Sequence, residues 1–288
     1  MYPTEEFAQR RSQAVEFINS AAPYDIQSLL LEQLRPSISL KIVQETEEAI
    51  SVGASKFGGV PDVPEGFEWP QWNEIPLGFL AQLNLDEIAP FDTENLLPKS
   101  GLLSFFISFD EENEVWGAAD QRQGWQVFHF ENWGLARSEF MPDAQTVLPA
   151  LKVLPEASWT LPFSSESVIA EFFDEDNLNF SEDVCEGYPG FYSDFCELFS
   201  AANKISGWPN TLQNPIEPLC QAEFASYLKK QDYWDEGGVE RWRFVFQFDS
   251  NVYIEEDWLY VGVFYFWVRY YDLEIGDFSS TWLMQQIS

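Results

Sequence analysis

Residues 56–61 read KFGGVP and residues 204–209 read KISGWP, and both fit the pattern K-x-(G/S)-G-x-P. Two apolar, strand-like segments follow each motif in the same order: LAQLN (80–84) and GLLSFFI (101–107), then VFQFD (245–249) and GVFYFWV (262–268). Matches that recur in one order are typical of a repeated unit. We therefore expect an internal duplication, with two β-rich halves related by a pseudo-twofold axis.

The strand-like segments carry polar residues at equivalent positions. Because side chains alternate across a strand, Gln82 and Asn84 are expected on the face opposite the apolar side chains. In the first half that apolar face would be formed by Leu77, Phe79, Ala81, Leu83 and Leu85. In the second half, Gln247 and Asp249 lie opposite an apolar face formed by Trp242, Phe244, Phe246 and Phe248.

These polar residues and the two motif lysines form a candidate ligand site. We expect a shared cleft between the halves, faced by Lys56, Gln82, Asn84, Lys204, Gln247 and Asp249. The glycine-rich turn beside Lys56 would expose backbone N–H groups as an anion-binding nest. The alternative is structural: the glutamines satisfy backbone groups of neighbouring loops, and the lysines form ordinary ion pairs.

The remaining patterns set the fold class and the organisation of the chain. Helical spacing of apolar residues predicts a helix from Thr4, as N-cap, to about Asn19 and another from Asp25 to Leu34. Strand-like alternation begins at SISLKIV (37–43). We expect an α+β protein with largely antiparallel or mixed sheets, packed as one globular unit. Its expected parts are an N-terminal helical segment (1–36), a first β-rich half (37–150), an acidic helical insert or linker (151–203) and a second β-rich half (204–288).

The chain is strongly acidic. It has 48 Asp and Glu residues against 15 Lys and Arg, a net charge of −33. Such charge repels nucleic acid and anionic membranes and favours a basic protein partner. The alternative is that the charge only keeps the surface solvated or adapts the protein to salt. The hydrophobic fraction of 45% excludes an intrinsically disordered chain.

One segment concentrates this charge. No Lys or Arg lies between Lys152 and Lys204. The candidate partner-binding residues in this acidic segment are Asp174, Glu175, Asp176, Glu182 and Asp183. A calcium loop is not expected here, because Leu178 would replace an oxygen ligand and Asn179 the required glycine. Residues 166–173 and 190–202 are expected to be helical.

Few residues offer catalytic or metal-binding chemistry. Three cysteines without CxxC spacing and a single histidine, His129, give no zinc signature. We predict no catalytic residue, metal or cofactor, although the many carboxylates neither support nor exclude acid–base chemistry. Residues 1–20 lack the apolar stretch of a signal peptide, which predicts a cytoplasmic protein. The sequence does not indicate the oligomeric state.

Several segments together resemble the YwqG-like family, a bacterial domain of unknown function, over about residues 50–288. They are SKFGGVPDVPEGFEWP (55–70), PLGFLAQLNLDEI (76–88), GLLSFFI (101–107), KISGWPNTLQ (204–213), FVFQFDS (244–250) and DLEIGDFSSTWLMQQIS (272–288). The resemblance implies an α+β fold without an established activity. Some relatives look like components of toxin and immunity neighbourhoods. We therefore expect a non-enzymatic binding protein with an acidic surface for a basic partner, as in an immunity-like role, and keep as the alternative an enzyme or small-ligand-binding protein that uses the cleft.

Overall fold

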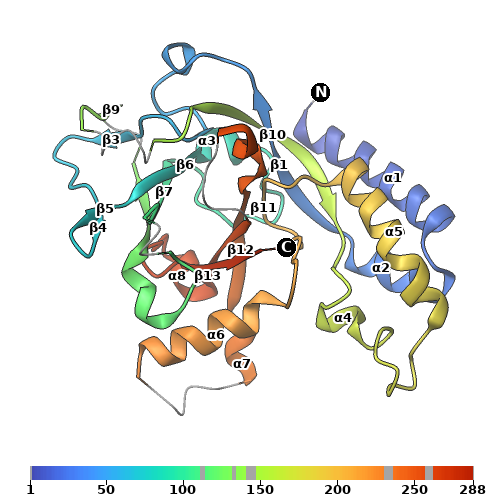
Figure 1. Ribbon diagram of the computed structural model, residues 1–288. Coiled ribbons are helices and arrows are strands. Elements are labelled where there is room, and N and C mark those ends of the chain that lie inside the picture. Colours follow the sequence, from blue (N-terminus) through green and yellow to red (C-terminus); the bar gives the residue numbers. More distant parts are fainter. Residues whose placement is uncertain are drawn as a thin grey trace.

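The computed structural model describes residues 2–110, 114–131, 134–140, 147–229, 236–256 and 262–287. Its centre is a ten-stranded sheet in which every neighbouring pair is antiparallel, which confirms the expected α+β class (Figure 1). In sheet order the strands are β14 (Trp282–Gln286), β13 (Val263–Arg269), β12 (Trp242–Asp249), β11 (Lys204–Ile205), β1 (Arg35–Val43), β10 (Leu151–Thr160), β2 (Lys56–Phe57), β6 (Gly78–Asn84), β7 (Leu102–Ile107) and β8 (Trp125–Phe130). Two-stranded ladders join β3 (Asp62–Pro64) to β9 (Leu135–Arg137), and β4 (Gln71–Trp72) to β5 (Ile75–Pro76).

The two edges of the large sheet come close together. The indoles of Trp125 on β8 and Trp282 on β14 meet edge to face, with 5.4 Å between ring centroids. Each indole N–H donates to a backbone carbonyl: Trp125 to Thr281 and Trp282 to Gly117, both at 2.9 Å. The sheet is therefore nearly closed, and its inner face is sealed from solvent.

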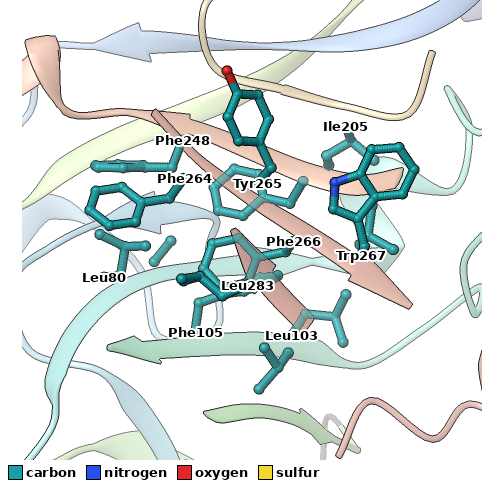
Figure 2. Packing of buried hydrophobic residues seen from close by; sticks show 14 of the residues in the cluster. Leu80, Leu103, Phe105, Ile205, Phe248, Phe264, Tyr265, Phe266, Trp267 and Leu283 are labelled. Carbon is teal, nitrogen blue, oxygen red and sulfur yellow. The ribbon is translucent and has the colours of Figure 1, made fainter. Parts of the chain in front are cut away.

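Aromatic side chains from both halves fill the interior (Figure 2). The Phe105 ring lies 4.8 Å from that of Phe246 and 4.9 Å from that of Phe266. Phe57 meets Phe248 at 5.1 Å. Aromatic pairs at these separations add to the free energy gained from burying their area. Because the rings come from both halves of the sequence, the halves share one core.

A β-bulge interrupts each strand that follows a motif. The register shifts between Phe79 and Ala81 on β6, and between Phe244 and Phe246 on β12. An extra residue in one strand breaks the alternation of side chains, so residues two apart on either side of it point to opposite faces of the sheet. Phe79 therefore packs with Leu77 in a small outer cluster, while Ala81 belongs to the main core. The expectation of a single apolar face from Leu77 to Leu85 is wrong for this reason.

A second core lies between one flank of the sheet and three helices, α1 (Pro3–Ala21), α2 (Gln27–Gln33) and α5 (Glu182–Phe199) (Figure 1). Phe17 of α1 stacks on Phe191 of α5 at 5.5 Å. The N-terminal helices are confirmed. Thr4 is not the N-cap, because α1 begins at Pro3 and Tyr2 holds that position without a side-chain bond.

The segment expected to be an acidic helical insert is only partly helical. Leu151–Thr160 form strand β10, because they pair along the whole of β1. The helix expected at 166–173 is reduced to α4 (Ser167–Ala170), and α5 begins at Glu182 rather than at residue 190. Glycine and proline at 187–190 obscured the start of α5 in the sequence. Burial of Val184 and Tyr188 offsets the cost of Pro189 within the helix.

The remaining helices are short or peripheral. They are α3 (Leu85–Ile88), α6 (Ile216–Tyr227), α7 (Glu236–Val239), α8 (Tyr270–Glu274) and the 3₁₀ turns η1 (Tyr24–Ile26), η2 (Glu47–Ala49), η4 (Ala119–Gly124) and η7 (Ser250–Glu256). In the part of the chain described above, no helix is both long and apolar enough to cross a membrane.

The shared core predicts a large effect of one ring. Phe246→Ala should lower the free energy of unfolding by about 3–5 kcal/mol, because Phe246 is fully buried among rings from both halves. Chemical denaturation monitored by circular dichroism measures this. Tyr24→Ala, at an 87% exposed position, is the control and should change stability by less than about 0.5 kcal/mol. A similar small loss for Phe246→Ala would contradict a core shared by the halves.

Candidate functional site

The structure divides the six candidate cleft residues into two groups, one in each half. Lys56 on β2 pairs in register with Gln82 on β6, and Lys204 on β11 pairs in register with Gln247 on β12. Strands β10 and β1 lie between β2 and β11. Within the described ranges we find no hydrogen bond or ion pair that joins the two groups.

The two glutamines share two equivalent hydrogen bonds, and Gln82 also donates to Asp62 Oδ2 at 2.7 Å. The side chain of Gln82 accepts from the backbone N–H of Asp62 at 2.9 Å and donates to the carbonyl of Ala54 at 2.8 Å. Gln247 accepts from the N–H of Asn210 at 2.8 Å and donates to the carbonyl of Ala202 at 2.7 Å. These partners stand at identical offsets from the two motif lysines. Each glutamine thus ties the turns on both sides of its lysine strand, as the structural alternative expected.

Lys56 belongs to a charge-balanced network. Its side chain is inaccessible to solvent, and Nζ lies 3.4 Å from Glu47 Oε1 and donates to the carbonyl of Val60. Arg137 bridges Asp62, at 2.8 Å, and Glu47. Burial lowers the pKa of Lys56, and the nearby Asp62 and Glu47 carboxylates oppose this effect. The network joins η2, β2, β3 and β9.

Lys204 has no carboxylate partner of this kind among the described residues. Its Nζ donates to Ser200 Oγ at 3.2 Å and to Asn210 Oδ1. Asn210 holds the position that Asp62 holds in the first half, so a neutral amide replaces a charged group. Burial lowers the pKa of Lys204 to about 7, against a weaker opposing effect of Cys196. The two halves therefore share geometry but differ in electrostatics.

Asn84 and Asp249 cap short helical turns. Asn84 Oδ1 accepts from the backbone N–H of Asp86 at 2.9 Å at the start of α3, and its Nδ2 donates to the Gly53 carbonyl at 2.7 Å. Asp249 Oδ1 accepts from the N–H of Asn251 at 2.9 Å. Asn84 also lines a small cavity of about 280 Å³.

The expected anion-binding nest beside Lys56 is wrong. The N–H groups of Gly58 and Gly59 donate to the carbonyls of Leu80 and Leu148, at 2.9 and 2.7 Å, so neither is available to a ligand. Both glycines have positive φ, and a Cβ on Gly59 would collide with Glu47. These glycines are needed for the turn that packs Glu47 against Lys56.

A cavity of about 1500 Å³ lies elsewhere, lined by both halves and by residues that the sequence analysis did not select. Arg35 stacks over the Trp208 ring at 3.5 Å in this cavity. Glu166 is 3% exposed, and burial together with Glu217 raises its pKa to about 8. Burial also raises the pKa of Glu217 and lowers that of Arg35. Perturbed carboxylates in a cleft are typical of functional sites. Among Arg35, Trp208, Glu166 and Glu217, only Trp208, in the second lysine motif, and Glu166, in the acidic segment, carried a signal in the sequence.

The candidate partner-binding residues form an exposed acidic face. We give this name to Asp174, Glu175, Asp176, Glu182 and Asp183, all of which are exposed on the loop before α5 and on its first turn. Ser181 caps α5 by accepting from the N–H of Val184. The loop lies at the end of the helical layer (Figure 1).

Most of the chain matches a known protein-family model. A family model described as Domain of unknown function (DUF1963) matches residues 55–286. The chain belongs to this family. No curated protein matches the chain. The DUF1963 match begins immediately before Lys56 and includes both lysine groups, the acidic face and most of the large cavity, whereas Arg35, α1 and α2 precede it.

The two buried lysines of the DUF1963 domain should respond differently to replacement. Lys56→Met should cost about 1–3 kcal/mol at pH 7, because it removes a cation from the balanced network around Glu47 and leaves the Val60 carbonyl without its donor. Lys204→Met should be nearly neutral or stabilising at pH 6, because it removes a buried charge that lacks a carboxylate partner. Urea denaturation of both variants and the wild type measures this difference.

The effect of Lys204→Met should also depend on pH. The Lys204 ammonium has a pKa of 10.5 in the unfolded chain, whereas in the folded protein its pKa is about 7. The wild type therefore gains stability as the pH rises between these two values. The advantage of the methionine should therefore be largest below pH 7 and vanish near pH 10. Equal effects of the two lysine replacements at every pH would contradict the electrostatic difference between the halves.

Glu166 gives the opposite pH dependence. The carboxyl group of Glu166 has a pKa of 4.5 in the unfolded chain and of about 8 in the folded protein. Burial of Glu166 therefore lowers the stability of the wild type as the pH rises between these two values. Glu166→Gln should therefore raise the free energy of unfolding by roughly 1–3 kcal/mol at pH 8 and much less at pH 5. Glu175→Gln, at an exposed position, is the matched control and should show no such trend. A pH-independent effect of Glu166→Gln would contradict the raised pKa.

Proposed function

We propose that this chain is a binding protein, without catalytic activity of its own, that captures a basic protein partner on its acidic face. The observation that carries this proposal is the exposure of every carboxylate in that face, in a stretch with no Lys or Arg from 153 to 203. Exposed carboxylates in a stretch of chain without Lys or Arg leave a negative potential directed at solvent. Such a potential speeds association with a basic surface and selects against acidic partners.

We also propose a biological setting for this binding. We propose that the chain belongs to the YwqG-like group of its family and acts in the cytoplasm. An immunity-like role, in which the partner is a basic toxin, agrees with the sign of the surface charge. Nucleic acids and anionic membranes are disfavoured as partners, because the net charge of −33 repels them.

We also infer that the two halves arose by duplication. The support is the shared motif, the matching bonds of Gln82 and Gln247, and the bulges that precede both glutamines. The sheet order supports this too, since β2-β6-β7-β8 and β11-β12-β13-β14 extend in opposite directions from the central β1–β10 pair. On this view the acidic segment was added between two copies that form one core.

The acidic face predicts a specific loss of binding. The triple change Asp174→Asn, Glu175→Gln and Asp176→Asn should weaken binding of the basic partner at least roughly tenfold and reduce its salt dependence. The partner is first captured from native lysate at low salt, and its affinity is then measured with purified proteins. The asparagine at 174 keeps an acceptor for the N–H of Asp176, so the loop should retain its shape.

A charge-matched control separates this face from the overall charge. Glu65→Gln, Glu68→Gln and Glu74→Gln remove the same number of exposed carboxylates from another part of the surface. This control should leave the affinity within about twofold. The proposed docking face would be wrong if both triple changes weakened binding equally, or if neither of them weakened it.

A further inference from the structure

The large cavity holds charged groups of both signs that do not pair with each other. Arg35, Glu166 and Glu217 all line it, and Arg35 and Glu217 both perturb the ionisation of Glu166. No ion pair among the described residues includes any of the three. Glu166 accepts only a long contact from Thr211, at 3.5 Å. Glu166 is buried, Glu217 is half-buried and Arg35 is exposed, so a ligand in the cavity would lie beside groups of both signs and would supply a partner for the buried Glu166.

A buried donor lines the same cavity. The indole N–H of Trp267 has no hydrogen-bond partner within the described ranges, and the residue is only 2% exposed. Trp267 and Tyr265 lie on the face of β13 opposite Phe264 and Phe266, which fill the core (Figure 2). Unsatisfied buried N–H groups are rare and call for an acceptor. The acceptor in this case would come from the occupant of the cavity.

These groups require a ligand with two kinds of polar end. A simple amine would satisfy Glu166 and Glu217. It would be repelled by the Arg35 guanidinium, however, and would leave the Trp267 donor unpaired. A simple carboxylate would suit Arg35 and Trp267 but would bring no cation to Glu166 and Glu217. A molecule with both an ammonium and a carboxylate group satisfies all of them.

We propose that this cavity binds a small zwitterion, a free α-amino acid, with its ammonium group at Glu166 and Glu217 and its carboxylate at Arg35. The Trp267 N–H is a further donor to the carboxylate. Apolar wall residues, Val168, Trp208, Trp242 and Leu273, are available to the amino-acid side chain. This site is separate from the acidic face, so either one can fail without the other.

The test uses the full chain and defined probes. Each of the twenty standard α-amino acids is screened at millimolar concentration for a rise in the melting temperature, and the strongest is measured by isothermal titration calorimetry. Its decarboxylated amine and its deaminated acid are titrated in parallel. We expect at least one amino acid to bind, and both analogues to bind at least roughly tenfold more weakly.

Variants assign the binding to this cavity. Glu166→Gln, Arg35→Gln and Trp267→Phe should each weaken the affinity at least roughly fivefold, whereas Glu175→Gln on the acidic face should leave it within about twofold. Trp267→Phe keeps an aromatic ring in place, so it remains informative if Arg35→Gln fails to fold. Absence of binding by every amino acid, an amine or acid that binds as tightly as the amino acid, or insensitivity to Glu166→Gln and Trp267→Phe would each overturn the proposal.

Discussion

The antiparallel pairing of β1 with β10 is the constraint on which the rest of the structure depends. It runs without interruption from Arg35 opposite Thr160 to Val43 opposite Lys152. Each of these long strands offers its other edge to a two-residue lysine strand, β11 on β1 and β2 on β10. Three further strands extend beyond each lysine strand, and the two outermost strands meet where Trp125 contacts Trp282. Because the sheet nearly closes, phenylalanines from both halves must fill one interior, and neither half can bury its aromatic face alone.

The lysine strands show how the same local geometry supports two electrostatic environments. Both are too short to be held by ladder hydrogen bonds alone, so Gln82 and Gln247 fix the flanking turns. In the first half, Asp62 and Glu47 balance the buried cation. In the second, Asn210 provides only a neutral acceptor, and the pKa of Lys204 falls to about 7. The charge that the chain exposes to partners lies elsewhere, on the acidic face, where solvation costs nothing.

Local sequence patterns predicted the parts of this structure that local forces determine. The N-terminal helices and the main strands follow from periodicity. The repeated motif selected the lysines and glutamines for one shared cleft, whereas the structure pairs Lys56 with Gln82 and Lys204 with Gln247 within separate halves. The face of Phe79 could not be predicted, because the bulge before Ala81 is set by pairing with β7. Strand β10 was missed because its pairing with β1 outweighs a weak local preference. Arg35, Glu166 and Glu217 meet in the cavity from distant parts of the chain, so no spacing rule connects them.

Native-state hydrogen exchange tests the central role of the β1–β10 pair most directly. If one nearly closed sheet with one core is correct, the buried amides of Ile38 and Val153 should exchange only through global unfolding. Amides of β7 and β12, one in each half, should exchange with the same free energy of opening, and denaturant should unfold the chain in a single transition. Exchange of β12 at a clearly lower free energy than β7, or two separate transitions, would show that the halves fold independently and would contradict the account.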